Sequence, residues 1–236
     1  MRGRARRIGL ILIAAAALVL STPAMASAAP VSALWDMNEP AGSRVMLDSS
    51  GNGLHGTLGA DVRAGTVVAG ATGYRFPYIL PNKPPARPAH LVQVPSHPLL
   101  NPESRTYAVE VRYRTTQNFG NILQKGQNGT PGGYWKFEQP NGIVACLFKG
   151  GNGQQRAVRS KVALNDGAWH TVKCERTATG LTMYVDGARH NYIAGSSGPI
   201  ANGNELSIGG KSRCDQYRTT CDYFVGDIDH VRIEKG

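Results

Sequence analysis

The chain has 236 residues, with 26 lysines and arginines against 16 acidic residues, which gives a formal net charge of +10 at neutral pH. No cluster of basic residues interleaved with aromatic residues occurs in it, so the positive charge does not indicate nucleic-acid binding, although it favours anionic surfaces in general. The length fits one large all-β domain or two small ones.

The first 29 residues have the pattern of a secretory signal peptide. Four arginines precede an almost continuous apolar run over residues 8–20, and small residues follow over 21–30. The run is too short to cross a membrane, and no later run approaches the roughly 18 residues that a span requires. We therefore expect residues 1–29 to be removed, which lowers the formal charge to +6, and residues 30–236 to be secreted. A retained N-terminal anchor is the alternative.

The remainder of the chain is dominated by short alternating segments, and none of them has a long helical periodicity. The clearest alternation lies in residues 107–114, where Glu110, Arg112 and Arg114 share one face and apolar side chains share the other. Five prolines in residues 77–88 predict a loop. We expect strands near residues 33–37, 54–58, 90–94, 107–114, 134–138, 143–148, 169–176, 181–185, 205–208 and 225–233.

Turn signals join several of these segments into hairpins. Asn141-Gly142 and Asp186-Gly187 are pairs that favour tight hairpin turns, and residues 178–180 connect two further segments. Many short strands with frequent turns predict an all-β fold, a two-sheet antiparallel jelly-roll sandwich. We expect it to form a single domain over residues 30–236.

The expected mature chain holds an even number of cysteines, which indicates disulfides in an exported protein. They are Cys146, Cys174, Cys214 and Cys221. Of the three possible pairings we expect Cys146–Cys174, between two strand-like segments, and Cys214–Cys221, across a short polar loop. A zinc site with four cysteine ligands is the alternative, but the spacing of the last two is not typical of zinc motifs.

Several segments in order resemble the laminin G-like domains of the concanavalin A-like lectin/glucanase superfamily. The segments that carry the resemblance are residues 34–39, 48–56, 122–126, 166–172, 181–187 and 226–233. The resemblance implies a concanavalin A-like sandwich. It does not determine the function, because this fold is used by lectins, adhesins and hydrolases alike.

Catalytic residues are not evident. The glucanases of the superfamily carry two carboxylates on one strand, as two-carboxylate glycoside hydrolysis requires, whereas here Glu110 has only arginines on its face. Asp227 and Asp229 are two residues apart, and His170 at a strand start is interpreted as structural. Residues 134–139 resemble part of an alginate lyase site only loosely. We expect no enzymatic activity, with a polysaccharide hydrolase or lyase as the alternative.

A structural Ca²⁺ is implied by the resemblance, because many superfamily members hold one where the N-terminal and C-terminal segments meet. Alternation in the last strand places Asp229 with Val231 and Ile233, so we expect its carboxylate to point inward, where it needs a partner or a metal. The alternative is that it accepts hydrogen bonds from turn backbone N–H groups. The expected metal ligands are Asp229, Asp36, Asn38 and Asp48.

Two sets of side chains are candidates for ligand binding. Candidates for an exposed aromatic platform are Tyr74, Tyr78, Tyr134, Tyr192 and Tyr217. Four cations expected on one sheet face are Arg112, Arg114, Lys136 and Lys173. Such a face, with Tyr134 beside it, would favour an anionic glycan or wall polymer. The alternatives are ordinary half-buried packing for the tyrosines and a solvated face for the cations.

The sequence therefore predicts a secreted, non-catalytic binding module whose partner is an extracellular or cell-wall glycan. A protein-binding adhesion module, as in the laminin G domains of matrix proteins, is the remaining alternative.

Overall fold

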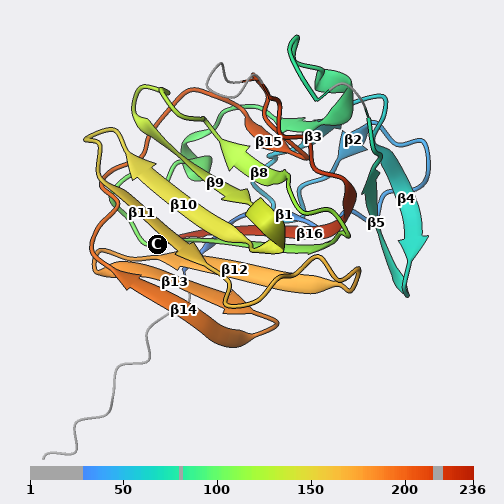
Figure 1. The fold of residues 1–236 in the computed structure, drawn as a ribbon. Coiled ribbons are helices and arrows are strands. Elements are labelled where there is room, and N and C mark those ends of the chain that lie inside the picture. The colour runs from blue at the N-terminus through green and yellow to red at the C-terminus, as the bar shows by residue number, and fades with distance from the viewer. Residues whose placement is uncertain (1–28, 80–81, 215–219) are drawn as a thin grey trace, which may run out of the picture.

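The computed structural model describes residues 29–79, 82–214 and 220–236, and it consists of two antiparallel sheets that lie face to face (Figure 1). The first sheet has the strand order β14-β13-β12-β7-β16-β5-β4, and β1 also pairs with β16. The second sheet has the order β11-β10-β9-β8-β15-β6-β3-β2. The predicted all-β, two-sheet antiparallel jelly-roll sandwich is confirmed.

The strands are short, as the turn frequency predicts. The first sheet holds β1 (Val31–Trp35), β4 (Arg63–Val68), β5 (Ala71–Phe76), β7 (Tyr107–Arg114), β12 (His170–Arg176), β13 (Gly180–Val185), β14 (Ala188–Ala194) and β16 (Gly226–Lys235). The second sheet holds β2 (Val45–Met46), β3 (Gly56–Leu58), β6 (Val92–Val94), β8 (Asn121–Lys125), β9 (Gly133–Glu138), β10 (Ala145–Gly150), β11 (Gln155–Arg159) and β15 (Leu206–Ile208). Three short 3₁₀ helices are η1 (Pro88–His90), η2 (Pro98–Leu100) and η3 (Pro140–Gly142).

Some strands were not predicted from the sequence, and those at the sheet edges share a physical reason. The strands β4, β11 and β14 lie at sheet edges, and β14 is exposed along almost its whole length. Because an edge strand of this kind buries neither face fully, its sequence need not alternate between apolar and polar residues. The expected strand at residues 54–58 is shorter in the structure and starts at Gly56.

The core lies between the two sheets and follows the predicted alternation of β7. Tyr107, Val109, Val111 and Tyr113 are completely buried and belong to the main core cluster. The intervening side chains of β7 therefore face outward, away from the second sheet. Because β7 lies between β12 and β16 in the first sheet, its outward side chains are positioned next to those of two further strands.

The two predicted glycine turns differ in length. Asp186 and Gly187 form a two-residue turn between β13 and β14, with φ values of 50° and 78°. Positive φ at both positions is the geometry for which this residue pair was predicted. Asn141 and Gly142 also have positive φ, but they belong to η3, which makes the connection from β9 to β10 longer than a two-residue turn.

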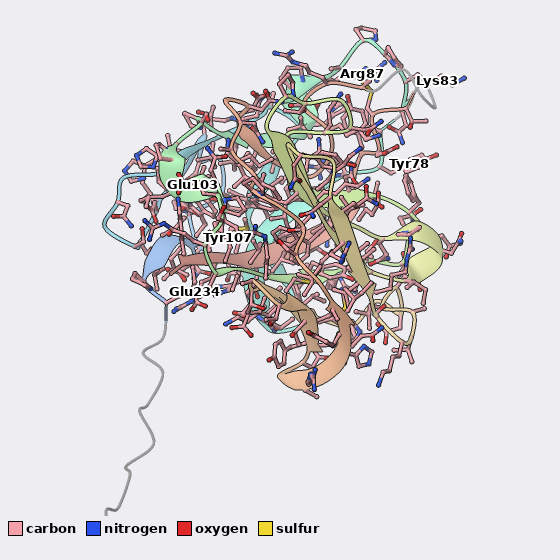
Figure 2. All side chains as sticks on the ribbon, turned by 90° about the vertical axis from the view of Figure 1, so that its left-hand side faces the viewer. Tyr78, Lys83, Arg87, Glu103, Tyr107 and Glu234 are labelled. Atoms are coloured by element: carbon pink, nitrogen blue, oxygen red, sulfur yellow. A yellow bond between two sulfur atoms is a disulfide. The ribbon has the colours of Figure 1, made fainter. Side chains whose placement is uncertain are left out.

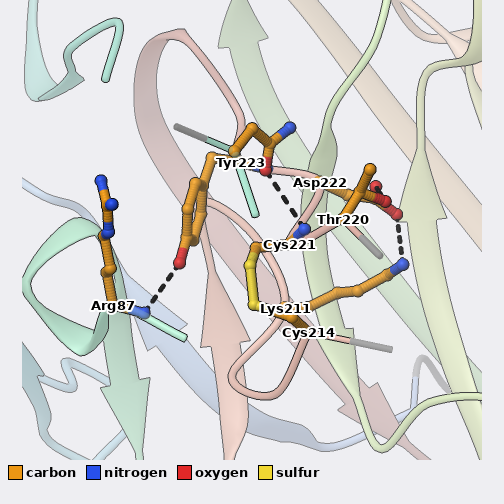
Figure 3. Close-up of a disulfide and its surroundings, with 8 residues drawn as sticks. Arg87, Lys211, Cys214, Thr220, Cys221, Asp222 and Tyr223 are labelled. Atoms are coloured by element: carbon orange, nitrogen blue, oxygen red, sulfur yellow. Dashed lines mark hydrogen bonds and ion pairs between the residues drawn. A yellow bond between two sulfur atoms is a disulfide. The ribbon is translucent and has the colours of Figure 1, made fainter. Parts of the chain in front are cut away.

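Both predicted disulfides form. Cys146 on β10 is bonded to Cys174 on β12, so this bridge joins the two sheets through the core. Cys214 is bonded to Cys221, whose backbone N–H donates to Asn82 (Figure 3). In the same view the hydroxyl of Tyr223 accepts a hydrogen bond from the backbone N–H of Arg87. The second bridge therefore belongs to a small separate cluster that ties the segment after residue 82 to the segment before β16.

Parts of the sequence predictions lie outside the described residues. Most of the predicted signal peptide, residues 1–28, and the candidate platform residue Tyr217 are among them. In the part of the chain that the structure describes, no helix is long and apolar enough to cross a membrane.

The two disulfides should contribute unequally to stability. Replacing Cys146 and Cys174 by alanine should lower the free energy of unfolding by about 3–4 kcal/mol, because the bridge closes a 28-residue separation in the unfolded chain. The same change at Cys214 and Cys221, which are seven residues apart, should cost about 2 kcal/mol. Urea denaturation of the two double variants measures both values. A larger loss for the second pair would contradict the role of the first as the link between the sheets.

Candidate functional site

The outward face of the first sheet carries three of the four predicted cations. Arg112 and Arg114 lie on β7, and Lys173 lies on the adjacent β12. Lys136 lies on β9 in the second sheet, so the prediction that all four cations share one sheet face is wrong. Alternation within a strand predicts which side chains share its face, but it does not predict to which sheet the strand belongs.

Each of the four cations is also paired with a carboxylate. The pairs are Arg112–Asp229, Arg114–Asp227, Lys173–Glu234 and Lys136–Glu138. The face is therefore a set of ion pairs, and the expected excess of positive charge from these four residues is largely neutralised. The partners of the first three cations all come from β16, which lies next to β7 in the sheet.

A β-bulge in β16 decides which of its side chains face outward. The pairing with β7 shifts by one residue between Ile228 and His230. Because of this shift Ile228, Val231 and Ile233 are all in the core, while Asp229 faces the ion pairs outside. The prediction that Asp229 shares an inward face with Val231 and Ile233 is wrong for this reason. The sequence does contain a signal for the bulge, since Ile228 and Val231 are three positions apart whereas Val231 and Ile233 are two positions apart.

The bulge requires a glycine on the neighbouring strand. Gly73 of β5 lies beside it, and a Cβ atom at this position would lie 2.6 Å from the carbonyl oxygen of Ile228 and 2.8 Å from the Cβ of Asp229. Any larger residue would push β5 away from β16. Gly73 thereby allows β5 to approach closely and to place Arg75 next to Asp227.

Asp229 is mostly buried and is held by one cation. Arg112 donates to its carboxylate, and the guanidinium carbon lies 4.9 Å from the ring centroid of Trp169. The indole N–H of Trp169 in turn donates to the backbone carbonyl of Val68. Burial raises the pKa of Asp229 above its ordinary value, although Arg112 and His230 act in the opposite direction. Arg112 therefore offsets part of the cost of burying this carboxylate.

The four predicted metal ligands do not come together. Asp36, Asn38 and Asp229 line one hollow of about 290 Å³, together with Arg112. Asp48 lies elsewhere, and its carboxylate accepts hydrogen bonds from three backbone N–H groups, those of Leu34, Ser50 and Leu54. Burial alone would raise the pKa of Asp48, but these three bonds lower it.

These contacts do not fit a cation site, because the guanidinium of Arg112 is bound to Asp229 and the carboxylate of Asp48 accepts hydrogen bonds from backbone N–H groups. In the described residues no group of three or more histidine, cysteine, aspartate or glutamate side chains could hold a metal ion. Calcium stays a prediction, and the geometry favours the ion pair.

A second hollow of about 230 Å³ lies where β5, β7 and β16 are adjacent. Its lining residues are Arg75, Phe76, Pro77, Tyr78, Arg114, Thr115, Thr116, Val225, Gly226 and Asp227. Asp227 is only 6% exposed and accepts from Nε and Nη2 of Arg75 and from Nη1 of Arg114, at 2.8, 3.2 and 3.1 Å. The hydrogen bonds to Asp227 raise the pKa of Arg75. The three charged groups are thus fixed relative to one another.

An exposed aromatic ring borders this hollow. Tyr78 is 65% exposed and projects away from the body of the molecule (Figure 2). Of the other predicted platform residues, Tyr74 and Tyr134 are buried, so their assignment to an exposed platform is wrong. Tyr192 is exposed on β14, where its ring contacts Arg189. The residues next to these tyrosines do not separate them, because the buried Tyr74 is followed by the charged Arg75, whereas the exposed Tyr78 has apolar neighbours on both sides.

A third hollow, of about 220 Å³, contains Glu110 but does not have catalytic properties. Its lining residues are Glu110, Thr171, Lys173, Glu175, Tyr184 and Gly187. A hydrogen bond from His230 lowers the pKa of Glu110, which is the opposite of what a general acid at neutral pH requires. Nearby, His170 lies between Asp166 and Asp186, at 3.1 and 2.9 Å. This contact stabilises the β13–β14 turn and is consistent with the structural role predicted for His170.

Two comparisons bear on the origin of this fold. A laminin G-type family model, described as the concanavalin A-like lectin/glucanases superfamily, matches residues 89–236. The match includes β7, β12 and β16, and it confirms the resemblance found in the sequence. In a sequence comparison no curated protein matches the chain.

Three solved structures with the same fold are described as binding domains. The binding domain of Paraclostridial Mosquitocidal Protein 1 has a TM-score of 0.60 at 11% identity, over 87% of this chain and 48% of that one. For the botulinum neurotoxin serotype G binding domain the values are 0.59, 12%, 87% and 46%. The serotype D ligand binding domain, in complex with N-acetylneuraminic acid, gives 0.58, 11%, 87% and 46%. At these identities the likeness shows the fold alone, and the chain spans less than half of each structure.

The Arg112–Asp229 pair makes a pH-dependent prediction. Replacing Arg112 by glutamine should lower the free energy of unfolding by about 1–3 kcal/mol at pH 7, because a buried carboxylate then loses its cation. The pKa of Asp229 in the folded variant rises further above that in the unfolded chain, so protonation relieves the cost as the pH falls. Urea denaturation between pH 7 and pH 4 should show this deficit shrinking.

The matched control for this prediction is Asp229→Asn in the Arg112→Gln background. It should remove the pH dependence of the deficit, because no titrating group is left at the position. A deficit of constant size across this pH range in the single variant would contradict the assigned ion pair.

Proposed function

This chain belongs to the concanavalin A-like lectin/glucanases superfamily, and we propose that it acts as an extracellular, non-catalytic carbohydrate-binding module. The fold it shares with the toxin binding domains supports a binding role. The one observation that carries the proposal is the exposed ring of Tyr78 beside the fixed group Arg75–Asp227–Arg114.

This arrangement matches the chemistry of a sugar ring. A saccharide has hydroxyl groups around its edge and patches of C–H groups on its faces. The ring of Tyr78 offers an apolar surface with a polar end. The hydroxyl of the exposed Thr116 and the guanidinium groups offer hydrogen-bond partners around it. A shallow concave site with an aromatic surface and a few convergent polar groups is typical of small-ligand recognition.

The polar groups of the hollow are also held in place before a ligand arrives. Arg75 is bound to Asp227 through two nitrogens, and Arg114 is bound both to Asp227 and to the backbone carbonyl of Gly167. Long arginine side chains normally lose conformational freedom when they bind a ligand. Here that loss has occurred on folding, so ligand binding costs less.

The carboxyl groups of this hollow do not match those that glycoside hydrolysis requires. Glycoside hydrolysis requires two carboxyl groups on either side of the bond that is cleaved. Asp227 is the one carboxylate among the described residues that line the hollow, and two arginines bind it. The hollow therefore lacks the second carboxyl group that glycoside hydrolysis requires.

Secretion is part of the proposal. The signal-like pattern of residues 1–29 supports export, and so do the two disulfides, since such bridges persist in oxidising compartments. The alternative of a protein-binding adhesion module is less well supported. The exposed large apolar side chains of the described chain lie on several separate elements: Val45, Leu47, Val67, Tyr78, Phe119, Val162, Tyr192 and Ile193. Protein interfaces more often present such residues as one contiguous patch.

Replacing Tyr78 by alanine should weaken carbohydrate binding at least tenfold, which corresponds to about 1.4 kcal/mol. Tyr78→Phe should retain most of the affinity, because the apolar ring face remains. Tyr192→Ala on β14 is the matched control, since it also removes an exposed tyrosine. Binding is measured by isothermal titration calorimetry with the best soluble oligosaccharide from an array of plant, bacterial and animal glycans. Binding to no glycan on the array, or an equal loss in both alanine variants, would contradict the proposal.

A further inference from the structure

The edge of the first sheet contains a pair of like charges directly opposite each other. Arg63 on β4 is the register partner of Arg75 on β5, so the two side chains lie on the same face of the sheet. Like charges in this position are destabilising. In the described part of the chain the side chain of Arg63 is exposed and forms no hydrogen bond or ion pair. Because this pair of like charges costs stability, it is a candidate for a functional role.

The charges around the hollow do not cancel. Arg63, Arg75 and Arg114 lie at or beside it, and one carboxylate, that of Asp227, faces them. Two acidic side chains from neighbouring segments are already engaged. Asp229 is bound to Arg112, and Asp166 is bound to His170. The remainder of the outward face is neutralised in pairs, whereas this corner keeps an excess of positive charge.

Hydrogen-bond donors also remain unused in the hollow. Arg75 binds Asp227 through Nε and Nη2, which leaves its Nη1 without a partner in the described residues. Arg114 uses Nε for Gly167 and Nη1 for Asp227, which leaves its Nη2. The side chains of Arg75 and Arg114 are 41% and 25% exposed, so a ligand can reach them. The negative charge of Asp227 is offset by the two guanidinium groups that bind it.

We propose that this hollow recognises an acidic saccharide through its carboxylate, which the unused nitrogens of Arg75 and Arg114 bind while Tyr78 contacts the sugar ring. The inference rests on the proposed carbohydrate-binding function and names the class of sugar. A guanidinium matches a carboxylate better than an ammonium does, because its planar N–H groups bind both oxygens. Arg63 contributes by its charge, which attracts the anion and offsets the desolvation of the carboxylate.

The experiment compares acidic sugars with their own methyl esters, which keep the ring and lose the charge. The probes are trigalacturonate, trimannuronate and 3′-sialyllactose, each in both forms, and dissociation constants are measured by calorimetry on the purified protein. At least one acid should bind tenfold or more tightly than its ester. Arg75→Gln should reduce binding of that acid about tenfold more than it reduces binding of the ester, so that most of the preference for the acid is lost.

Two further variants separate recognition from general charge and from misfolding. Arg189→Gln removes one charge from β14, which lies at the opposite edge of the first sheet from β4 and β5. This variant should leave the preference for the acid intact. Arg63→Gln leaves both arginine–Asp227 contacts in place, so the fold should not change, and it should weaken acid binding two- to threefold. A thermal melt checks that each variant is folded.

The outcomes distinguish the two proposals. If neutral glycans bind and no acid is preferred over its ester, the carboxylate inference is overturned and the carbohydrate-binding function stands. If Arg75→Gln and Arg189→Gln weaken acid binding equally, overall charge accounts for the effect and the inference is also overturned. If neither acidic nor neutral sugars bind, the proposed function itself fails.

Discussion

The strand β16 is the element on which the first sheet depends, because it pairs with β1, β5 and β7 and thus joins the beginning, the middle and the end of the chain. Its apolar residues do not follow a regular alternation. Only the bulge at Asp229 allows Ile228 and Val231 to enter the core together. Burial of these side chains therefore stabilises the bulge, and the bulge in turn sets the outward direction of the polar side chains on either side of it.

The ion pairs of the outward face follow from this geometry. Asp227 is the register partner of Arg114, and Asp229 binds Arg112 from the bulge, so the charges of the two strands neutralise one another. The pattern changes at β5, where Asp227 receives a second arginine and β4 adds a third. The same strand that neutralises the centre of the sheet therefore leaves positive charge at its edge. That edge is also where the exposed Tyr78 lies.

The fold and the disulfides could be predicted from the sequence because they depend on local signals. Alternation in residues 107–114, the turn at Asp186-Gly187 and an even number of cysteines each act over a few residues or follow from composition. The site could not be predicted, because it depends on which strands are neighbours. Lys136 has the same alternation as Arg112 but lies in the other sheet, and Tyr78 is exposed although both of its neighbours in the sequence are apolar. Arg63 and Arg75 lie next to each other only because of the register between β4 and β5.

Ligand binding at the corner formed by β5, β7 and β16 can be tested directly by NMR. Backbone amide shifts of ¹⁵N-labelled protein are followed during titration with the tightest-binding probe of the acidic and neutral sugars named above. If the ligand binds in the hollow, the largest chemical-shift changes should occur in the segments that line it, residues 75–78, 114–116 and 225–227. Changes centred on the second sheet, for example on β9 and β10, would contradict it and would place the binding site on the opposite face of the molecule.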